Sequence, residues 1–273
     1  MQGTINKMRA SVQADGSLQY VLPLGQEALP LNELLGKTLT LQYTGRIFCV
    51  ACGRKTNKSF NQGYCYPCFI KLAQCDTCIV KPELCHFAKG TCREPDWGRE
   101  FCFRPHVVYL ANSSGIKVGI TRDTQIPTRW IDQGAVQALP IFRVNSRRAA
   151  GLVEVALASK IPDKTNWRNL LKGPASLLDM QESKSVVMAQ CAQVLADVVL
   201  PEEDGAYEPW GDATEFRVDY PVLQYPAKIQ SIDFEKSPVL GGELWGIKGQ
   251  YLIFDTGVIN MRKFGGYEIA AAH

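Results

Sequence analysis

The chain has 273 residues, 30 lysines and arginines against 27 aspartates and glutamates, and 46% hydrophobic residues, a composition typical of a globular protein with a buried core. No apolar run approaches the ~18 residues that a membrane helix needs, and residues 1–7 are polar and lack the apolar core of a signal peptide. We therefore expect a cytoplasmic protein without a membrane partner.

The charge is unevenly distributed along the chain. Residues 1–174 hold 23 lysines and arginines against 12 acidic residues, whereas residues 175–273 hold 7 against 15. The net charge of +3 therefore combines a basic first part with an acidic second part. A basic surface attracts polyanions, so this distribution favours DNA or RNA as a partner. Ordinary variation among surface residues is the alternative interpretation.

Both ends of the chain are predicted to form strands. Residues 18–24 and 37–43 are rich in β-branched, leucine and tyrosine residues, and the second stretch alternates cleanly. Residues 214–273 show the same kind of short strands, separated by glycines. We expect the two ends to close into one small barrel or sandwich, with the rest of the chain inserted between its halves.

Nine of the ten cysteines lie between residues 49 and 102. The first four form two Cys-x-x-Cys pairs, Cys49 with Cys52 and Cys65 with Cys68, with twelve residues between the pairs. Two such tight turns place four thiolates around one tetrahedral ion. The pattern predicts a zinc ribbon with one structural Zn²⁺, and a redox role for either pair is the alternative.

The next five thiols and one imidazole are more than a single tetrahedral ion can use. We expect a second Zn²⁺ with four ligands, namely Cys75, Cys78, Cys85 and Cys92. Either His86 or Cys102 can replace one of them, and the sequence does not choose. An iron–sulfur cluster, which also accepts four thiolates, is the alternative to zinc.

The stretch from residue 106 to residue 174 alternates strands and helices. Its predicted elements are, in order, strands at 107–111 and 116–121, a short helix through Arg129, a strand at 139–144 and a helix from Ser146 to Lys160. Pro162 is expected to stop the last helix. Glu154 lies on that helix among apolar neighbours, so its carboxylate needs a cation, a metal or another partner.

This order of elements and polar residues resembles the GIY-YIG nuclease superfamily. The first strand motif of that family appears as Val107-Val108-Tyr109. The second appears as Lys117-Val118-Gly119, with lysine where the family name has tyrosine. The resemblance implies an α+β fold, in which a GIY-YIG-like three-stranded antiparallel sheet carries flanking helices and follows the zinc-ribbon module.

Three further residues match the family in order along the chain. Arg129 corresponds to its helix arginine, Glu154 to its single metal-binding carboxylate and Asn166 to its downstream asparagine. Gln133 stands where many members carry histidine. Lys117 and Gln133 are therefore the two departures from the family pattern.

The resemblance implies a metal-dependent endonuclease that hydrolyses DNA or RNA phosphodiesters. Tyr109 would help to activate the attacking water, and Glu154 would hold one Mg²⁺ or Mn²⁺. Arg129 would stabilise the negative charge that develops on the phosphate. Asn166 would steady the end of the Glu154 helix or a water of the metal. Lys117 would place a second cation beside the phosphate, or act as the base with a lowered pKa.

Four other cations are expected to contact nucleic acid, namely Arg54, Lys55, Lys58 and Arg122. Two further functions remain open. One is a nucleic-acid-binding protein whose nuclease-like domain has lost its chemistry, which the Lys117 and Gln133 departures favour. The other is a scaffold for protein interactions built on the acidic half.

The whole chain is also similar to an uncharacterised bacterial family known only as a domain of unknown function. The stretches that carry this similarity are residues 90–95, 117–122, 129–135 and 246–251. The sequence thus predicts five parts: an N-terminal β segment (1–48), a cysteine-rich zinc-binding region (49–105), a GIY-YIG-like domain (106–174), a helix with an acidic connector (175–213) and a C-terminal β-rich domain (214–273).

Overall fold

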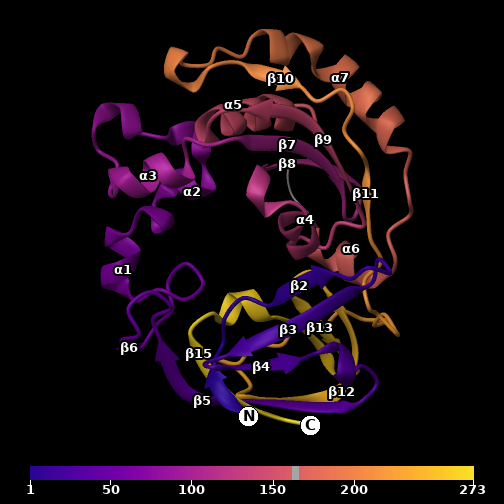
Figure 1. Cartoon of the computed structure of the whole chain (residues 1–273). Helices are drawn as coiled ribbons and strands as arrows, with labels where there is room; N and C mark the ends of the chain where they lie inside the picture. The colour runs from indigo at the N-terminus through magenta and orange to yellow at the C-terminus, as the bar shows by residue number, and fades with distance from the viewer. Residues whose placement is uncertain (162–165) are drawn as a thin grey trace.

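The computed structural model describes residues 1–161 and 166–273, which form three antiparallel sheets with helices packed beside them (Figure 1). The α+β class predicted from the sequence is therefore confirmed. None of the described helices is both long and apolar enough to pass through a membrane.

The two ends of the chain meet in one seven-stranded sheet. Its strands are β1 (Gln2–Thr4), β5 (Thr38–Phe48), β6 (Lys55–Thr56), β12 (Val239–Lys248), β13 (Tyr251–Phe254), β14 (Gly257–Asn260) and β15 (Tyr267–Ala272). They are ordered β1-β15-β5-β12-β13-β14, and β6 pairs with the far end of β5. The last strand of the chain thus lies between the first strand and β5, which brings both termini to the same region (Figure 1).

A second sheet packs on the same hydrophobic core. It consists of β2 (Arg9–Val12), β3 (Leu18–Leu24) and β4 (Glu27–Pro30). Leu22 of β3, Leu41 of β5 and Leu252 of β13 are fully buried together in that core, because alternate residues of each strand face inward. Of the two forms expected, a small barrel or a sandwich, a closed barrel is not formed by the described strands. The ladder ends at β1 and β14, which have only three and four residues and remain short edges.

The central sheet has the predicted succession of strand, strand, helix, strand and helix. Its strands are β7 (His106–Asn112), β8 (Ile116–Arg122), β9 (Gln137–Val144), β10 (Tyr207–Pro209) and β11 (Phe216–Arg217). The order is β10-β9-β7-β8, and β11 also pairs with β9. The three expected strands are thus extended by two more. The acidic connector supplies β10, because the ring of Tyr207 packs on Phe142 of β9 at 5.1 Å between centroids.

Three helices accompany the central sheet: α4 (Thr128–Asp132), α5 (Arg147–Ala158) and α7 (Met180–Ala196). A further helix, α6 (Trp167–Lys172), packs through Leu170 and Leu171 against β13 and β14 of the seven-stranded sheet. Helices α5 and α7 cover one face of the sheet (Figure 1) and share its core. Ser146 caps α5 as predicted, since its hydroxyl accepts a hydrogen bond from the backbone nitrogen of Ala149 at 3.0 Å. Pro162, expected to stop this helix, lies outside the described residues.

Residues 49–105 form the cysteine-rich arm, which runs from β5 to β7. Its helices are α1 (Tyr66–Lys71), α2 (Thr77–Val80) and α3 (Pro95–Phe101), joined by short 3-10 turns. Figure 1 shows the arm on the left, between the terminal sheets at the bottom and the central sheet at the top. The arm therefore connects two parts of the protein that are built from distant stretches of sequence.

The shared core of the terminal sheets predicts a clear difference between two residues of β12. Leu244 is fully buried, whereas Val239 is 49% exposed. Leu244→Ala should lower the free energy of unfolding by about 2–5 kcal/mol, because it leaves a cavity. Val239→Ala should change it by no more than about 0.5 kcal/mol. Urea unfolding followed by circular dichroism measures both, and equal losses would contradict the assigned faces of β12.

Candidate functional site

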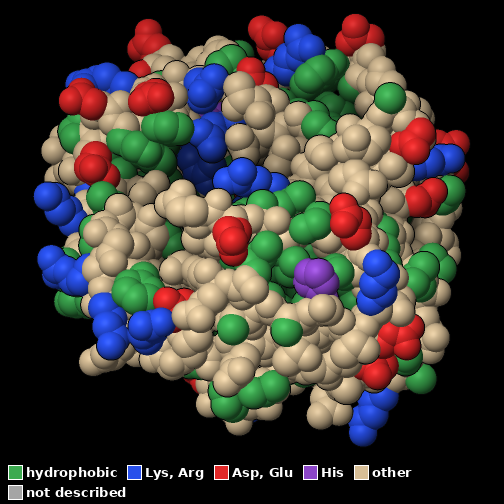
Figure 2. All heavy atoms as spheres, turned by 60° about the horizontal axis from the view of Figure 1, so that its bottom comes forward, with side chains coloured by type: hydrophobic (Ala, Val, Ile, Leu, Met, Phe, Trp, Pro, Cys, Tyr) green, Lys and Arg blue, Asp and Glu red, His purple; other side chains and the backbone are tan. Residues whose placement is uncertain are grey.

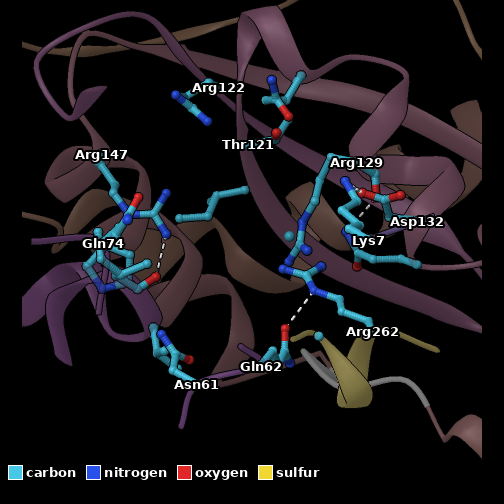
Figure 3. A pocket seen from close by; sticks show the side chains of 18 of the residues that line it. Lys7, Asn61, Gln62, Gln74, Thr121, Arg122, Arg129, Asp132, Arg147 and Arg262 are labelled. Atoms are coloured by element: carbon cyan, nitrogen blue, oxygen red, sulfur yellow. Dashed lines mark hydrogen bonds and ion pairs between the residues drawn. The ribbon is translucent and has the colours of Figure 1, made fainter. Parts of the chain in front are cut away.

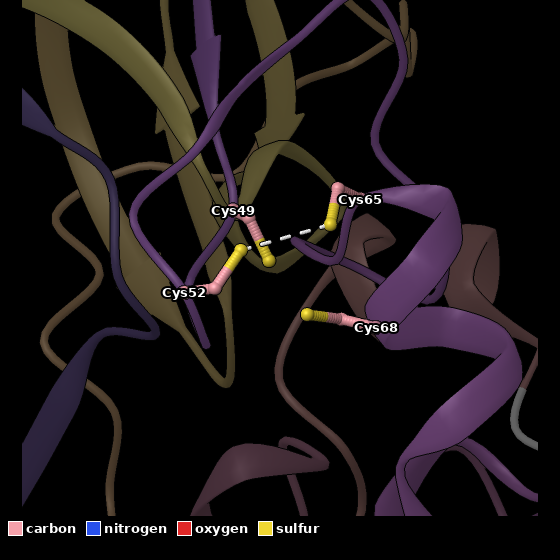
Figure 4. Close-up of side chains that lie close together, drawn as sticks. All are labelled: Cys49, Cys52, Cys65 and Cys68. Atoms are coloured by element: carbon pink, nitrogen blue, oxygen red, sulfur yellow. Dashed lines mark hydrogen bonds between the residues drawn. The ribbon is translucent and has the colours of Figure 1, made fainter.

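The first four cysteines form a cluster able to hold a metal ion such as zinc. Cys49 and Cys52 come from the turn after β5, and Cys65 and Cys68 from the start of α1 (Figure 4). All four sulfur atoms lie within 4.8 Å of one another, and the Sγ atoms of Cys52 and Cys65 are 3.8 Å apart. Four thiolates at ~2.3 Å from a tetrahedral zinc ion are separated by about 3.8 Å, so the cluster fits this ion.

The thiols of this cluster influence one another strongly. At Cys49, burial raises the pKa, but hydrogen bonds from the backbone of Cys65, Cys52 and Ala51 and from the Cys52 thiol lower it to about 6. At Cys68, desolvation and hydrogen bonds with the other three thiols raise the pKa to about 12. Four thiols this close cannot all ionise without a cation between them. A divalent ion supplies that charge.

The loop between the two cysteine pairs reaches into a large cleft. Asn61 and Gln62 adopt positive φ angles of 43° and 65°, an uncommon conformation for residues other than glycine. Gln62 Oε1 accepts a hydrogen bond from Arg262 Nε at 2.7 Å. The loop between the two cysteine pairs of the first cluster therefore holds an arginine from the other end of the chain.

The cleft has a volume of about 620 Å³ and opens where the arm, the central sheet and the terminal sheets meet. Its charged lining consists of two carboxylates, Asp132 and Glu154, and five cations: Lys7, Arg122, Arg129, Arg147 and Arg262. Figure 3 shows the arginines entering the cleft from opposite walls, and Figure 2 shows lysine and arginine side chains gathered at a hollow of the surface. The cleft is therefore strongly basic.

Three residues with predicted catalytic roles lie together in this cleft. Tyr109 comes from β7, Arg129 from α4 and Glu154 from α5. Burial raises the pKa of Tyr109, Arg129 and a hydrogen bond with Gln133 lower it, and the Glu154 charge raises it. The net shift is upward, so Tyr109 is a neutral phenol at neutral pH. The mutual effects show that the three side chains are within electrostatic reach.

The four arginines of the cleft form no ion pair with a carboxylate in the part of the chain that the structure describes. Burial lowers the pKa of Arg122, Arg147 and Arg262, and neighbouring arginine cations lower it further. Asp132 pairs with Lys7 and accepts a hydrogen bond from Gln250. The crowded positive charge would be stabilised by an anionic ligand.

The two departures from the GIY-YIG pattern contact each other. Lys117 Nζ donates a hydrogen bond to Gln133 Oε1 at 2.6 Å, and Gln133 Nε2 donates one to Tyr109 Oη at 2.5 Å. Gly119 lies opposite Tyr109 in the β7–β8 register. A Cβ at position 119 would be 2.7 Å from Tyr109 Oη, so only glycine leaves room for this ring.

Other predicted site residues lie elsewhere. Asn166 does not line the cleft, and its Oδ1 caps α6 by accepting hydrogen bonds from two backbone nitrogens. Of the four cations expected to bind nucleic acid, Arg122 lines the cleft, whereas Arg54, Lys55 and Lys58 are placed on the arm outside it. Three of the predicted ligands of the second ion, Cys78, Cys85 and Cys92, line one small cavity, and Cys75 does not.

Two cations of the cleft, Lys7 and Arg147, were not singled out from the sequence. Arg147 lies seven residues before Glu154 on α5, and this spacing of two helical turns places both on one face. That spacing is a signal that could have revealed Arg147. Lys7 has no comparable signal, because pairing of the chain ends brings it to the cleft.

A protein-family model described as "Protein of unknown function (DUF2797)" matches residues 36–269. The match includes the arm, the central sheet and most of the terminal seven-stranded sheet. Of the charged residues that line the cleft, only Lys7 lies outside it. No curated protein and no solved structure matches the chain.

The first cysteine cluster predicts a specific loss of metal. Cys52→Ser should lower the zinc content by one ion per chain, because a serine hydroxyl is a poor replacement for a thiolate ligand. Cys191→Ser should keep the wild-type content, since Cys191 is buried in α7 with the core of the central sheet. Elemental analysis of the purified proteins measures both, and an unchanged zinc content in Cys52→Ser would refute the cluster as a zinc site.

The contact between Tyr109 and Gly119 predicts a stability loss. Gly119→Ala should lower the free energy of unfolding by about 1–3 kcal/mol, because the methyl group displaces a buried ring. Gly211→Ala is the control, since a Cβ there has nothing within 4 Å, and it should change stability by less than about 1 kcal/mol. Chemical unfolding compares the two variants, and an equal effect would argue against the close approach.

Proposed function

We propose that this chain, which belongs to the DUF2797 family of proteins of unknown function, is a metal-dependent nuclease that hydrolyses phosphodiester bonds of DNA or RNA. The observation that carries the proposal is the convergence of Tyr109, Arg129 and Glu154 in one basic cleft. These residues match the GIY-YIG motifs of the sequence. The order of strands and helices around them is the order that the resemblance implies.

The arginines are suited to binding a phosphate backbone. A guanidinium group is planar and donates two parallel hydrogen bonds to phosphate oxygens. Arg129 is the arginine whose side chain interacts with Tyr109, so we assign it to the scissile phosphate, where negative charge develops in the transition state. Arg122, Arg147 and Arg262 would hold the neighbouring phosphates.

Tyr109 is assigned to positioning the attacking water. Its Oη accepts a hydrogen bond from Gln133 Nε2, so its own hydrogen can be donated to an acceptor in the cleft. Lys117 fixes the orientation of the Gln133 amide by donating to Oε1. Lys117 therefore acts as a positioning residue for Tyr109 in this scheme, and the role of base is not assigned to it.

Glu154 is assigned as the carboxylate ligand of Mg²⁺ or Mn²⁺. Glu154 is half-buried on α5 and its charge acts on both Tyr109 and Arg147. A divalent ion bound there would polarise the phosphate and lower the pKa of a bound water.

A nucleic-acid-binding protein without catalysis is the second candidate. The observation that favours it is the complete burial of Tyr109, whose side chain is 0% exposed, so its hydroxyl has little access to an attacking water. In that case the same arginines would bind the backbone, and no bond would be cleaved. The two candidates share a ligand and differ in the reaction.

Cleavage assays separate the candidates. Labelled single- and double-stranded DNA and RNA are incubated with the full chain and Mg²⁺ or Mn²⁺. Glu154→Gln should reduce the cleavage rate at least ~100-fold with little change in affinity, since it removes transition-state stabilisation. Arg143→Ala is the control, because Arg143 is exposed on β9, stacked on Trp210 and not part of the cleft lining.

The outcomes differ for each candidate. Salt-dependent binding without cleavage on any substrate would favour the second candidate over the first. Cleavage by Glu154→Gln at the wild-type rate would overturn the assignment of the site. Absence of binding to every nucleic acid would overturn both candidates.

A further inference from the structure

The distal half of the cysteine-rich arm carries a second set of thiols around a small cavity. Cys78, Cys85, Cys92 and Cys102 line this cavity, together with the aromatic rings of Phe87, Trp97 and Phe103. The cavity measures about 20 Å³, which is room for one water-sized group. All four cysteines are half-buried, so they are neither core residues nor freely exposed.

The four thiols line the same cavity, and they are spaced more widely than those of the first cluster, because among the described residues no three of their sulfur atoms lie within 4.8 Å of one another. Of these four, Cys78 and Cys85 have side chains that interact with each other. Cys92 Sγ is 3.3 Å from the position that a Cβ on Gly98 would occupy, so the glycine of α3 leaves space for this sulfur.

Cys75 shares a Cys-x-x-Cys motif with Cys78 but belongs to other surroundings. It is only 6% exposed. Its thiol hydrogen-bonds with Asn61, and the charge of Cys49 acts on it, so it lies towards the first cluster. The chain turns between the two cysteines, since Asp76 is extended between a 3-10 turn and α2. The Cys-x-x-Cys spacing therefore suggests that Cys75 and Cys78 bind one ion together, whereas the fold separates their side chains.

Asp76 and His86 are close to Cys78, with their ligand atoms and its sulfur within 4.8 Å of one another. Both have other partners. Arg93 Nε pairs with Asp76 Oδ2 at 2.8 Å, and His86 Nε2 lies 3.3 Å from the same oxygen. His86 Nδ1 is 2.8 Å from Thr91 Oγ1. We therefore do not assign Asp76 and His86 as metal ligands, and we regard them as residues that pack beside the thiols.

The charge around the cavity suits a tetrathiolate site. Four thiolates and one Zn²⁺ carry a net charge of −2, which needs nearby cations. Arg147 and Arg148 begin α5, where the positive end of the helix dipole also lies. The charge of Arg147 acts on Cys102, and that of Arg148 acts on Cys85.

The same cavity lies at the junction of the arm with α5. The backbone nitrogen of Arg147 donates to the carbonyl of Cys102 at 2.8 Å. Arg147 Nη2 donates to the carbonyl of Ile79, the residue after Cys78, at 2.5 Å. Pro82 packs against Gly151, where a Cβ would be 2.6 Å from the proline Cβ. A linkage among the cysteines would therefore fix the arm to the helix that carries Glu154.

We propose that Cys78, Cys85, Cys92 and Cys102 bind a second zinc ion, which fastens the distal half of the arm to α5. Binding replaces the thiol protons with one Zn²⁺ and releases them to solvent. Thiolates are ligands that zinc prefers, and a closed four-sulfur site stabilises a fold without taking part in chemistry. The proposal does not depend on nuclease activity, because its test measures metal content.

The experiment compares single cysteine variants of the full chain, purified with zinc and analysed for zinc and iron. Wild type should contain two zinc ions per chain. Cys102→Ser and Cys92→Ser should each contain one. Cys75→Ser is the matched control, because it removes a thiol of the same arm that lies outside the cavity, and it should retain both ions. His86→Ala should also retain both.

Alkylation of the wild-type protein provides a second measurement that needs no variant. Half-exposed free thiols react with iodoacetamide, whereas zinc-bound thiols are protected. Mass spectrometry should find Cys78, Cys85, Cys92 and Cys102 protected, and all four should become reactive as a chelator removes the second ion. Their labelling in the zinc-loaded protein would overturn the site.

The metal analysis has equally definite contrary outcomes. One ion per wild-type chain would overturn the second site. Loss of one zinc ion in Cys75→Ser, together with two zinc ions retained in Cys102→Ser, would overturn the proposed ligand set. It would show that Cys75 binds the second ion and that Cys102 does not. Loss in His86→Ala would overturn the four-cysteine set, and iron in place of zinc would overturn the choice of ion.

Discussion

Four arginines face one cleft without a carboxylate partner among the described residues, and the fold must hold them there against their mutual repulsion. Three of them are held by neutral groups of the cysteine-rich arm. Arg262 donates to the amide oxygen of Gln62, Arg147 donates to the carbonyl of Ile79, and Arg122 lies over the ring of Phe101 at 5.1 Å. Such contacts fix a guanidinium group without neutralising it, so its charge stays available to a ligand.

Metal ions bound by the arm would serve this use of it. A short segment with few regular elements buries little apolar surface, so its own core contributes little stability. The first cysteine cluster orders the loop that presents Gln62, and the four thiols of the distal half surround the junction that presents Ile79. Metal sites at these two positions would hold the wall of the cleft rigid.

The sequence predicted local features well and long-range ones poorly. The β7–β8 hairpin, the cap at Ser146 and the first cysteine cluster depend on residues near one another in the chain, so pattern and spacing are sufficient for them. Association of the two chain ends was also expected from their similar strands. The register that places Arg262 beside Gln62 was not expected from the sequence, because it arises from pairing of strands that lie some two hundred residues apart. The separation of Cys75 from Cys78 depends on one turn of the backbone that the motif does not encode.

Lys117 and Gln133 illustrate how a structure changes the meaning of a sequence pattern. As separate positions they are two departures from the GIY-YIG pattern that the sequence resembles. In the fold they are hydrogen-bonded to each other, and Gln133 is hydrogen-bonded to Tyr109. A lysine that is only 5% exposed must have an acceptor, and the glutamine oxygen provides one. Because the same amide then presents its nitrogen to the tyrosine hydroxyl, the two substitutions act as one unit that orients Tyr109. The two departures therefore do not by themselves indicate a degenerate site.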